Sequence, residues 1–255
     1  MMEKIMKRGV IAMIALLTSS PTGPLDRSRI VEGFDSKNML VENLKERWVE
    51  NARCLLISAA PAESAMADGM RAHMVEAMGI SGLSAEVCDI WDDRTEDFSV
   101  ETLKSYDVIF LGGGHVPTQN AFFQRIELRE KIAQFEGMVI GISAGTMNSA
   151  DVVYAQPELE GESVDPAYQR FIPGLGLTKI NVIPHYQMIK DAVLDGQRVF
   201  EDISYADSMG HVFYALVDGT YIICENGSET VWGEAYRIAD GKLEQICEEN
   251  QTLVL

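Results

Sequence analysis

Short apolar runs alternate along most of the chain with segments whose apolar residues recur at helical spacing. The apolar runs predict strands over residues 54–58, 85–91, 108–111 and 138–142. The helical spacing predicts helices over residues 36–50, 66–78, 101–105 and 121–136. This alternation is typical of βαβ units, so we expect an α/β fold with a mostly parallel sheet and helices on both faces. Ligands of such sheets bind beyond the carboxyl ends of the strands.

The last third of the chain has a different pattern, in which short strand-like runs follow one another closely. These runs predict strands over residues 221–224, 230–232 and 234–238. Asn226-Gly227 and Asp240-Gly241 are dipeptides that favour tight hairpin turns. We therefore expect antiparallel strands near the C-terminus that extend or flank the parallel sheet. Because we find no linker, repeat or low-complexity tract, we expect residues 1–255 to form a single domain.

The start of the chain allows two interpretations. Lys4, Lys7 and Arg8 precede an apolar run over residues 10–17, as they would in a secretory signal peptide. The run is short, however, and residues 18–21 (TSSP) follow it without an A-x-A-like cleavage site. This favours a buried first strand that ends in a polar turn. Because no apolar stretch approaches the length of a membrane span, we expect a soluble, cytoplasmic protein that binds no membrane.

Composition narrows the classes of partner. Of 255 residues, 47% are hydrophobic, which is enough for a sizeable core and excludes global disorder. The 21 Lys and Arg against 39 Asp and Glu give a net charge of −18, which disfavours nucleic acid as a partner. The four cysteines have no CxxC or CxxH spacing, so we expect no metal, and no organic cofactor is implied. We interpret Cys54, Cys88 and Cys224 as small buried hydrophobic residues.

The motif that most strongly indicates a catalytic residue is Gly141-Ile142-Ser143-Ala144-Gly145, which follows a predicted strand. It matches G-x-S-x-G, where a sharp strand-to-helix turn exposes the hydroxyl group of a nucleophilic serine. The N–H of Ala144 would then point toward a developing oxyanion. An ordinary tight turn is the alternative interpretation. The neighbouring strand ends in Gly112-Gly113-Gly114, whose N–H groups are candidates for the other half of the oxyanion hole.

A nucleophilic serine needs a base, and the four histidines of the chain are the candidates. His185 lies in residues 181–186 (NVIPHY), at the end of an apolar run, which is a rigid position at the active edge of a sheet. His115 follows the glycine triplet, which favours a place in the wall of the site over the role of base. His73 lies in a predicted helix, and His211 has no motif around it. The residues alone leave the choice of base open.

Four motifs in this order resemble the peptidase E / cyanophycinase family of serine peptidases, whose fold is related to the class I glutamine amidotransferases. They are Gly112-Gly113-Gly114, Gly141-Ile142-Ser143-Ala144-Gly145, Pro184-His185-Tyr186 and Ala215-Leu216-Val217-Asp218-Gly219-Thr220. The resemblance spans roughly residues 10–240. It implies that Ser143 is the nucleophile, His185 the base and Asp218 the acid. It also implies an oxyanion hole formed by Gly113 or Gly114 together with Ala144.

The function implied by the resemblance is hydrolysis of short peptides through an acyl-enzyme, by a monomer or homodimer. An ordinary Asp-Gly turn remains the alternative for Asp218, and the acidic stretch 157–162 (PELEGE) holds other candidate acids. The relatives that cleave aspartyl dipeptides are expected to hold the substrate carboxylate with an arginine. Arg198 is our candidate for that role, with Arg170 as a competitor, and His115 is our second substrate-binding candidate.

Two departures from related families bear on function. His115 stands where relatives often have Asn, so aspartyl specificity is an open question. Glutamine amidotransfer expects Cys in place of Ser143 and Glu in place of Gln187, so that reaction is disfavoured. The alternative function is that of a non-catalytic, or differently specialised, amidotransferase-like protein that binds a small molecule.

Overall fold

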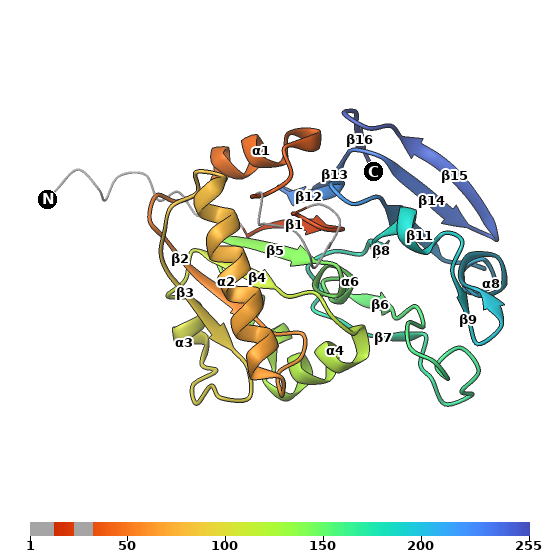
Figure 1. The fold of residues 1–255 in the computed structure, drawn as a ribbon, viewed down its shortest axis with the longest axis horizontal. Coiled ribbons are helices and arrows are strands. Elements are labelled where there is room, and N and C mark those ends of the chain that lie inside the picture. Colours follow the sequence, from red (N-terminus) through yellow and green to blue (C-terminus); the bar gives the residue numbers. More distant parts are fainter. Residues whose placement is uncertain (1–12, 23–32) are drawn as a thin grey trace, which may run out of the picture.

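The computed structural model describes residues 13–22 and 33–255, and within them one large sheet dominates the fold (Figure 1). This main sheet has the strand order β16-β13-β12-β1-β5-β4-β2-β3. Its strands are β1 (Ile14–Thr18), β2 (Ala52–Ile57), β3 (Ala85–Trp91), β4 (Val108–Leu111), β5 (Met138–Ile142), β12 (Tyr221–Glu225), β13 (Ser228–Trp232) and β16 (Thr252–Val254).

The main sheet joins a parallel part to an antiparallel part at β1. From β1 through β5, β4 and β2 to β3, neighbouring strands run parallel. On the other side of β1, strands β12, β13 and β16 pair antiparallel. Every residue of β4 is buried, because parallel strands are covered on both faces and therefore consist of continuous apolar runs. The predicted mostly parallel sheet is confirmed, and so are the antiparallel strands after residue 220.

Helices cover both faces of the parallel part, as the sequence predicts. Helices α1 (Leu40–Arg47) and α2 (Ser64–Ile80) pack on one face, where Met74 contacts the cluster around Leu56. Helices α3 (Val100–Leu103), α4 (Val116–Arg125) and α5 (Leu128–Ile132) pack on the other. Met66, at the start of α2, does not belong to this core, because it is 56% exposed.

Two predicted helices have different bounds in the structure. The segment predicted as one helix over 121–136 contains α4 and α5, which are separated where Glu127 takes a left-handed φ of 53°. The segment predicted over 36–50 begins with a 3-10 turn (Lys37–Met39) and becomes α-helical only at α1. Asn38 and Met39 have φ angles of 53° and 59° there, so no continuous helix passes through them. The spacing of apolar residues does not reveal such breaks.

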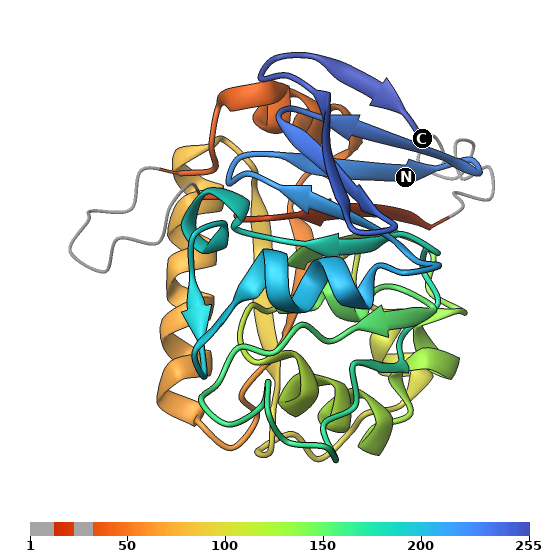
Figure 2. The same ribbon diagram turned by 90° about the vertical axis from the view of Figure 1, so that its right-hand side faces the viewer.

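A second sheet packs against the main sheet near its antiparallel part. Its strand order is β15-β14-β11-β8. These strands are β8 (Asn181–Ile183), β11 (Val212–Leu216), β14 (Ala235–Ala239) and β15 (Lys242–Cys247). Leu17 of β1 packs with Val182 and Leu216 across the interface. Figure 2 shows the blue C-terminal strands gathered at one end of the molecule. The strand predicted over 234–238 therefore belongs to a separate sheet that flanks the main one.

The remaining elements are short and surround the second sheet and the end of β5. They are α6 (Ala144–Asn148), β6 (Val152–Tyr154), β7 (Phe171–Pro173), α7 (Tyr186–Ile189), β9 (Val193–Leu194), β10 (Gln197–Arg198), a π-helix (Val199–Ser204) and α8 (Tyr205–Asp207). Every helix within the described residues is too short or too polar to cross a membrane.

The start of the chain contributes the strand at the centre of the main sheet. In β1 all residues after Ile14 are buried, which explains the apolar run. The earlier residues of that run, through position 12, lie outside the described residues. Because β1, β5 and β4 are parallel and adjacent, the segments that follow them meet at one edge of the sheet. The candidate site lies at this edge.

Candidate active site

Ser143 occupies a strained turn between β5 and α6. Its φ of 50° and ψ of −109° lie outside the regions that residues other than glycine normally adopt. Such a conformation costs about 1–3 kcal/mol and persists only where the surroundings hold it. The Ser143 N–H donates to the Thr18 carbonyl (3.2 Å), and the Thr146 hydroxyl donates to the same oxygen (2.8 Å). The end of β1 thus holds the turn that presents Ser143.

The two glycines of the motif are needed for close packing around this turn. A Cβ atom at Gly141 would lie 2.7 Å from the Thr146 Oγ1 atom. A Cβ atom at Gly145 would collide with the carbonyl oxygen of Leu111 on β4. The G-x-S-x-G pattern therefore corresponds to the predicted strand–turn–helix geometry.

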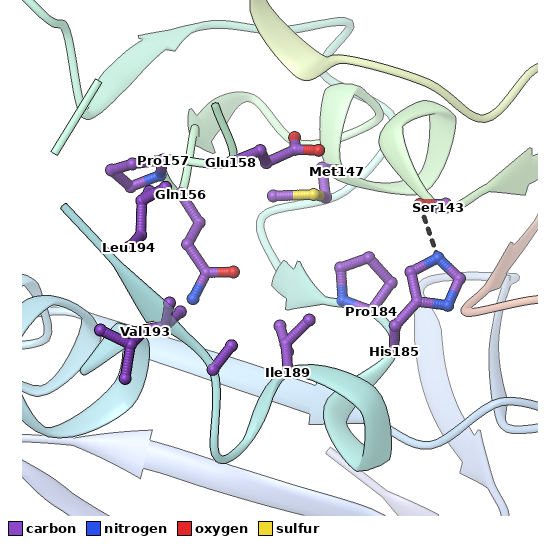
Figure 3. A pocket seen from close by; sticks show the side chains of 12 residues that line it. Ser143, Met147, Gln156, Pro157, Glu158, Pro184, His185, Ile189, Val193 and Leu194 are labelled. Atoms are coloured by element: carbon purple, nitrogen blue, oxygen red, sulfur yellow. Dashed lines mark hydrogen bonds between the residues drawn. The ribbon is translucent and has the colours of Figure 1, made fainter. Parts of the chain in front are cut away.

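His185 joins Ser143 to Asp218 in one chain of hydrogen bonds, and Figure 3 shows the first of them, between Ser143 and His185. Its Nε2 atom lies 2.8 Å from the Ser143 hydroxyl, and its Nδ1 atom lies 2.6 Å from Asp218 Oδ1. With Asp218 ionised, Nδ1 carries the proton and donates it to the carboxylate. Nε2 is then free to accept the proton of the serine hydroxyl. The three side chains are thus arranged in the order that acyl transfer requires of a nucleophile, a base and an acid.

The Asp218 side chain is nearly inaccessible, at 2% exposure, and two further groups hold its carboxylate. Ser19 donates to Oδ1 at 2.7 Å, and the Gln187 side-chain amide donates to Oδ2 at 2.7 Å. Burial alone would raise the pKa of Asp218, but the hydrogen bonds and charge of His185, with Ser19 and Gln187, hold it below its usual value. Asp218 is therefore stabilised as the carboxylate.

Ser19 and Gln187 are the residues that the sequence reasoning missed. Ser19 also accepts the backbone N–H of His185 at 2.8 Å, so it positions two members of the site. Gln187 accepts the backbone N–H of Asp218 at 3.1 Å with its side-chain oxygen. The sequence marked Gln187 only as a departure from amidotransferases. The one feature of the sequence that could have indicated Ser19 is its place as a polar residue directly after a buried strand.

Gly113 lies closest to Ser143 in the glycine turn after β4. A Cβ atom at Gly113 would be 3.5 Å from the Ser143 Cβ atom, whereas one at Gly114 would meet Ala59 at 2.7 Å. The Gly112 N–H donates to the Ile57 carbonyl at 3.0 Å. Among the described residues we see no acceptor for the N–H groups of Gly113 and Gly114. Within that part of the chain, both N–H groups are candidates for the oxyanion hole.

A pocket of about 290 Å³ opens beside Ser143 and His185. Its walls come from the start of α6, from the segment after β6 and from residues 184–199 (Figure 3). Besides Ser143 and His185, Gln156 and Glu158 supply the polar side chains of the lining, and the rest of it is apolar. A substrate carbonyl placed at Ser143 would therefore have one flanking side chain in this pocket.

The sequence matches the profile of peptidase family S51 over residues 31–231. The chain belongs to peptidase family S51. This membership confirms the resemblance that the four motifs indicated, and it makes the chain a member of a family of peptidases. No curated protein matches the chain.

Two solved structures resemble this S51 member. A peptidase from an acI-B1 actinobacterium has a TM-score of 0.61 and 17% sequence identity, with 97% of this chain and 98% of that chain covered. A putative peptidase E protein from Listeria monocytogenes EGD-e has a TM-score of 0.56 and 16% identity, with coverages of 92% and 98%. At such identities the likeness establishes a shared fold.

The candidate substrate-binding residues of this S51 member lie outside the pocket lining. His115 directly precedes α4, and its ring contacts Glu162 (Nε2 to Oε1, 2.7 Å) and Thr118 (Nδ1 to Oγ1, 2.8 Å). Arg198 is 59% exposed and pairs with Asp202 at 2.6 Å. Neither is among the residues that line the pocket, and their roles toward substrate stay predictions.

Arg170 and the acidic stretch of residues 157–162 make contacts of their own. Arg170 donates to the Ser163 carbonyl at 3.1 Å and stacks on Tyr168. Within the acidic stretch, Glu162 pairs with His115, whereas the acid that contacts His185 is Asp218. No three His, Cys, Asp or Glu side chains gather as a metal site within residues 13–22 and 33–255.

Proposed function

We propose that this chain is a serine peptidase that cleaves short peptides through a Ser143 acyl-enzyme. The observation that carries the proposal is the continuous chain of hydrogen bonds from the Ser143 hydroxyl through His185 to Asp218. In this mechanism Ser143 Oγ attacks the peptide carbonyl carbon while His185 Nε2 takes its proton. His185 then gives that proton to the leaving amine, and water releases the acyl group in the reverse sequence.

The backbone around Ser143 supports stabilisation of the oxyanion that forms during this attack. The N–H of Ala144 follows the nucleophile, and the Gly113 N–H lies on the neighbouring turn. Two N–H groups that converge on the oxyanion are the usual arrangement for acyl transfer, and each contributes about 2.7–4 kcal/mol to lowering the barrier. Gly114 is the second candidate of the same turn.

Two further observations support binding of a peptide residue beside Ser143 and a cytoplasmic location. The pocket beside Ser143 has a volume of about 290 Å³, which suits one residue of a peptide substrate. The four cysteines are free thiols, which fits a reducing compartment such as the cytoplasm.

The direct test is hydrolysis of a panel of dipeptides by the wild type and by Ser143→Ala, followed by amine release. We expect turnover of part of the panel by the wild type and a loss of at least about 10³-fold in Ser143→Ala. Binding of small molecules without any hydrolysis would favour the alternative of a non-catalytic, amidotransferase-like binding protein. Equal hydrolysis by both proteins would exclude Ser143 as the nucleophile.

A further inference from the structure

The pocket beside Ser143 is apolar over most of its surface. The side chains that make it so come from α6, from the segment after β6 and from residues 184–199, among them Met147, Pro157, Ile189, Val193 and Leu194. Among the described residues that line the pocket, none is Lys or Arg. Burying a carboxylate without a cationic partner costs several kcal/mol. The pocket therefore disfavours an acidic side chain and suits an aliphatic one.

One carboxylate lies at the rim of this apolar pocket. Glu158 is exposed as a residue, but its carboxyl group is directed toward Met147 and the Ser143 side of the pocket (Figure 3). The charges of His115 and His185 and the backbone N–H of Val116 all act to lower the pKa of this carboxyl group, so it lies in the neighbourhood of the catalytic candidates. The carboxyl group therefore faces the same pocket as Ser143 and His185.

The surroundings of Glu158 favour a cationic partner. Crowding of the carboxyl group by protein atoms raises the pKa of Glu158, although the nearby His115 opposes the rise. A raised pKa means that the carboxylate lacks full compensation for its charge in this structure. A substrate ammonium group beside Glu158 would supply that compensation.

We infer that this site, if it acts as the proposed peptidase, is specific for peptides with a free N-terminus and an apolar first residue. The first side chain fills the apolar pocket, and Glu158 binds the α-ammonium group. When the bond cleaved is the one after the first residue, the α-amino nitrogen is attached to the same Cα as the carbonyl carbon that Ser143 attacks. An ammonium group so close to the reacting carbon lies at the Ser143 side of the pocket, toward which the carboxyl group of Glu158 is directed. The net charge of −18 further disfavours an acidic first residue.

The test compares four p-nitroanilides: leucyl, N-acetyl-leucyl, aspartyl and lysyl. We expect kcat/KM for the leucyl compound to exceed that for the aspartyl compound by about 100-fold or more. We expect the acetylated compound to be about 10- to 100-fold poorer than the free one, because it lacks the charged hydrogen bond to Glu158. Preference for the aspartyl compound would overturn the inference. Preference for the lysyl compound would overturn it too, because the pocket would then accept a cationic side chain.

The variant Glu158→Gln tests the role of the carboxylate itself. We expect its KM for leucyl p-nitroanilide to rise about 10- to 100-fold with little change in kcat, while hydrolysis of the acetylated compound is unchanged. Glu160→Gln is the matched control, because Glu160 is exposed on the same loop and does not line the pocket. An unchanged ratio between free and acetylated substrates in Glu158→Gln would overturn the assignment.

A fluorophosphonate probe separates failure of this inference from failure of the proposed function. The probe labels a reactive serine whatever the specificity of the pocket. Labelling of Ser143 combined with preference for aspartyl or acetylated substrates would refute this inference and leave the serine peptidase intact. Absence of labelling in a folded protein would refute both.

Discussion

At the scale of the residue, the proposed acid is the most strongly supported member of the site. Asp218 accepts hydrogen bonds from His185, Ser19 and Gln187, and its pKa is held below the usual value despite burial. Such support fixes the imidazole in one orientation and one tautomer. The serine hydroxyl then faces an unprotonated nitrogen.

Asp218→Asn tests that tautomer argument. An asparagine amide at this position can donate to His185 Nδ1, which places the imidazole proton on Nε2 and removes the acceptor for the Ser143 hydroxyl. We expect kcat to fall by about 10⁴-fold near neutral pH, as serine hydrolases show for this change. Steady-state kinetics, with circular dichroism to confirm folding, provide the measurement. Activity within about threefold of the wild type would show that Asp218 has no role in the reaction.

Gln187→Met tests a positioning residue of similar size. The variant loses the hydrogen bond to Asp218 Oδ2 and the acceptor of the Asp218 N–H. We expect kcat to fall about 10-fold with little change in KM, because the acid is less well held. Met188→Gln is the matched control, since Met188 is 59% exposed on the same helical turn. Equal kinetics of Gln187→Met and wild type would show that the other contacts suffice.

The sequence indicates Ser143 through a motif with a physical requirement at that position, whereas His185 and Asp218 are indicated by the resemblance to the peptidase E / cyanophycinase family. It does not indicate Ser19, whose role depends on β1 lying between β5 and β12. The pairing of β1 with β5 and β12 joins positions that are more than a hundred residues apart. No local pattern encodes such a contact. The same reason hides the hydrogen bond between Gln187 and Asp218.

At the scale of the element, apolar runs predict the parallel strands well because those strands are buried on both faces. The helices are predicted less well where single residues interrupt them. Glu127 has a φ of 53° between α4 and α5, and nothing in the apolar spacing of residues 121–136 signals that break. Hairpin dipeptides predict the C-terminal turns, but they do not tell which of the two sheets receives each strand.

The turn around Ser143 gives an element-scale prediction. Gly145→Ala would place a methyl group against the Leu111 carbonyl of β4, and α6 would have to move. We expect a loss of about 1–3 kcal/mol in the free energy of unfolding, measured with urea, together with loss of activity. Gly69→Ala is the control, because that glycine is exposed in α2 with open space around it. There we expect a gain of about 0.5–1 kcal/mol. Equal stability of the two variants would contradict the close packing.

At the scale of the whole molecule, the site depends on how the two sheets meet. Ser143 follows β5 of the main sheet, His185 follows β8 of the second sheet, and Asp218 lies on the segment from β11 to β12 that links them. The apolar interface that includes Leu17 and Leu216 therefore sets the distances between the three side chains. A rearrangement of this interface would separate His185 from Ser143.

Thiol reactivity measures how well this packing is preserved in solution. Burial raises the pKa of Cys54 and Cys224 to about 12 and that of Cys88 to about 11, so their thiolate forms are scarce at mildly alkaline pH. We expect iodoacetamide to leave these three thiols unmodified in the native protein and to modify them in concentrated guanidinium chloride. Mass spectrometry of tryptic peptides gives the extent of modification. Rapid alkylation of Cys54 in the native state would contradict the packed core.

The most direct test of the central claim is the covalent reaction of Ser143 with a fluorophosphonate, followed by intact mass and peptide mapping. The account predicts one adduct per chain, located on Ser143, and its loss in Ser143→Ala. It also predicts labelling slowed by orders of magnitude in His185→Gln, because the base is removed. Labelling elsewhere, or equal labelling of wild type and His185→Gln, would contradict a serine nucleophile activated by His185.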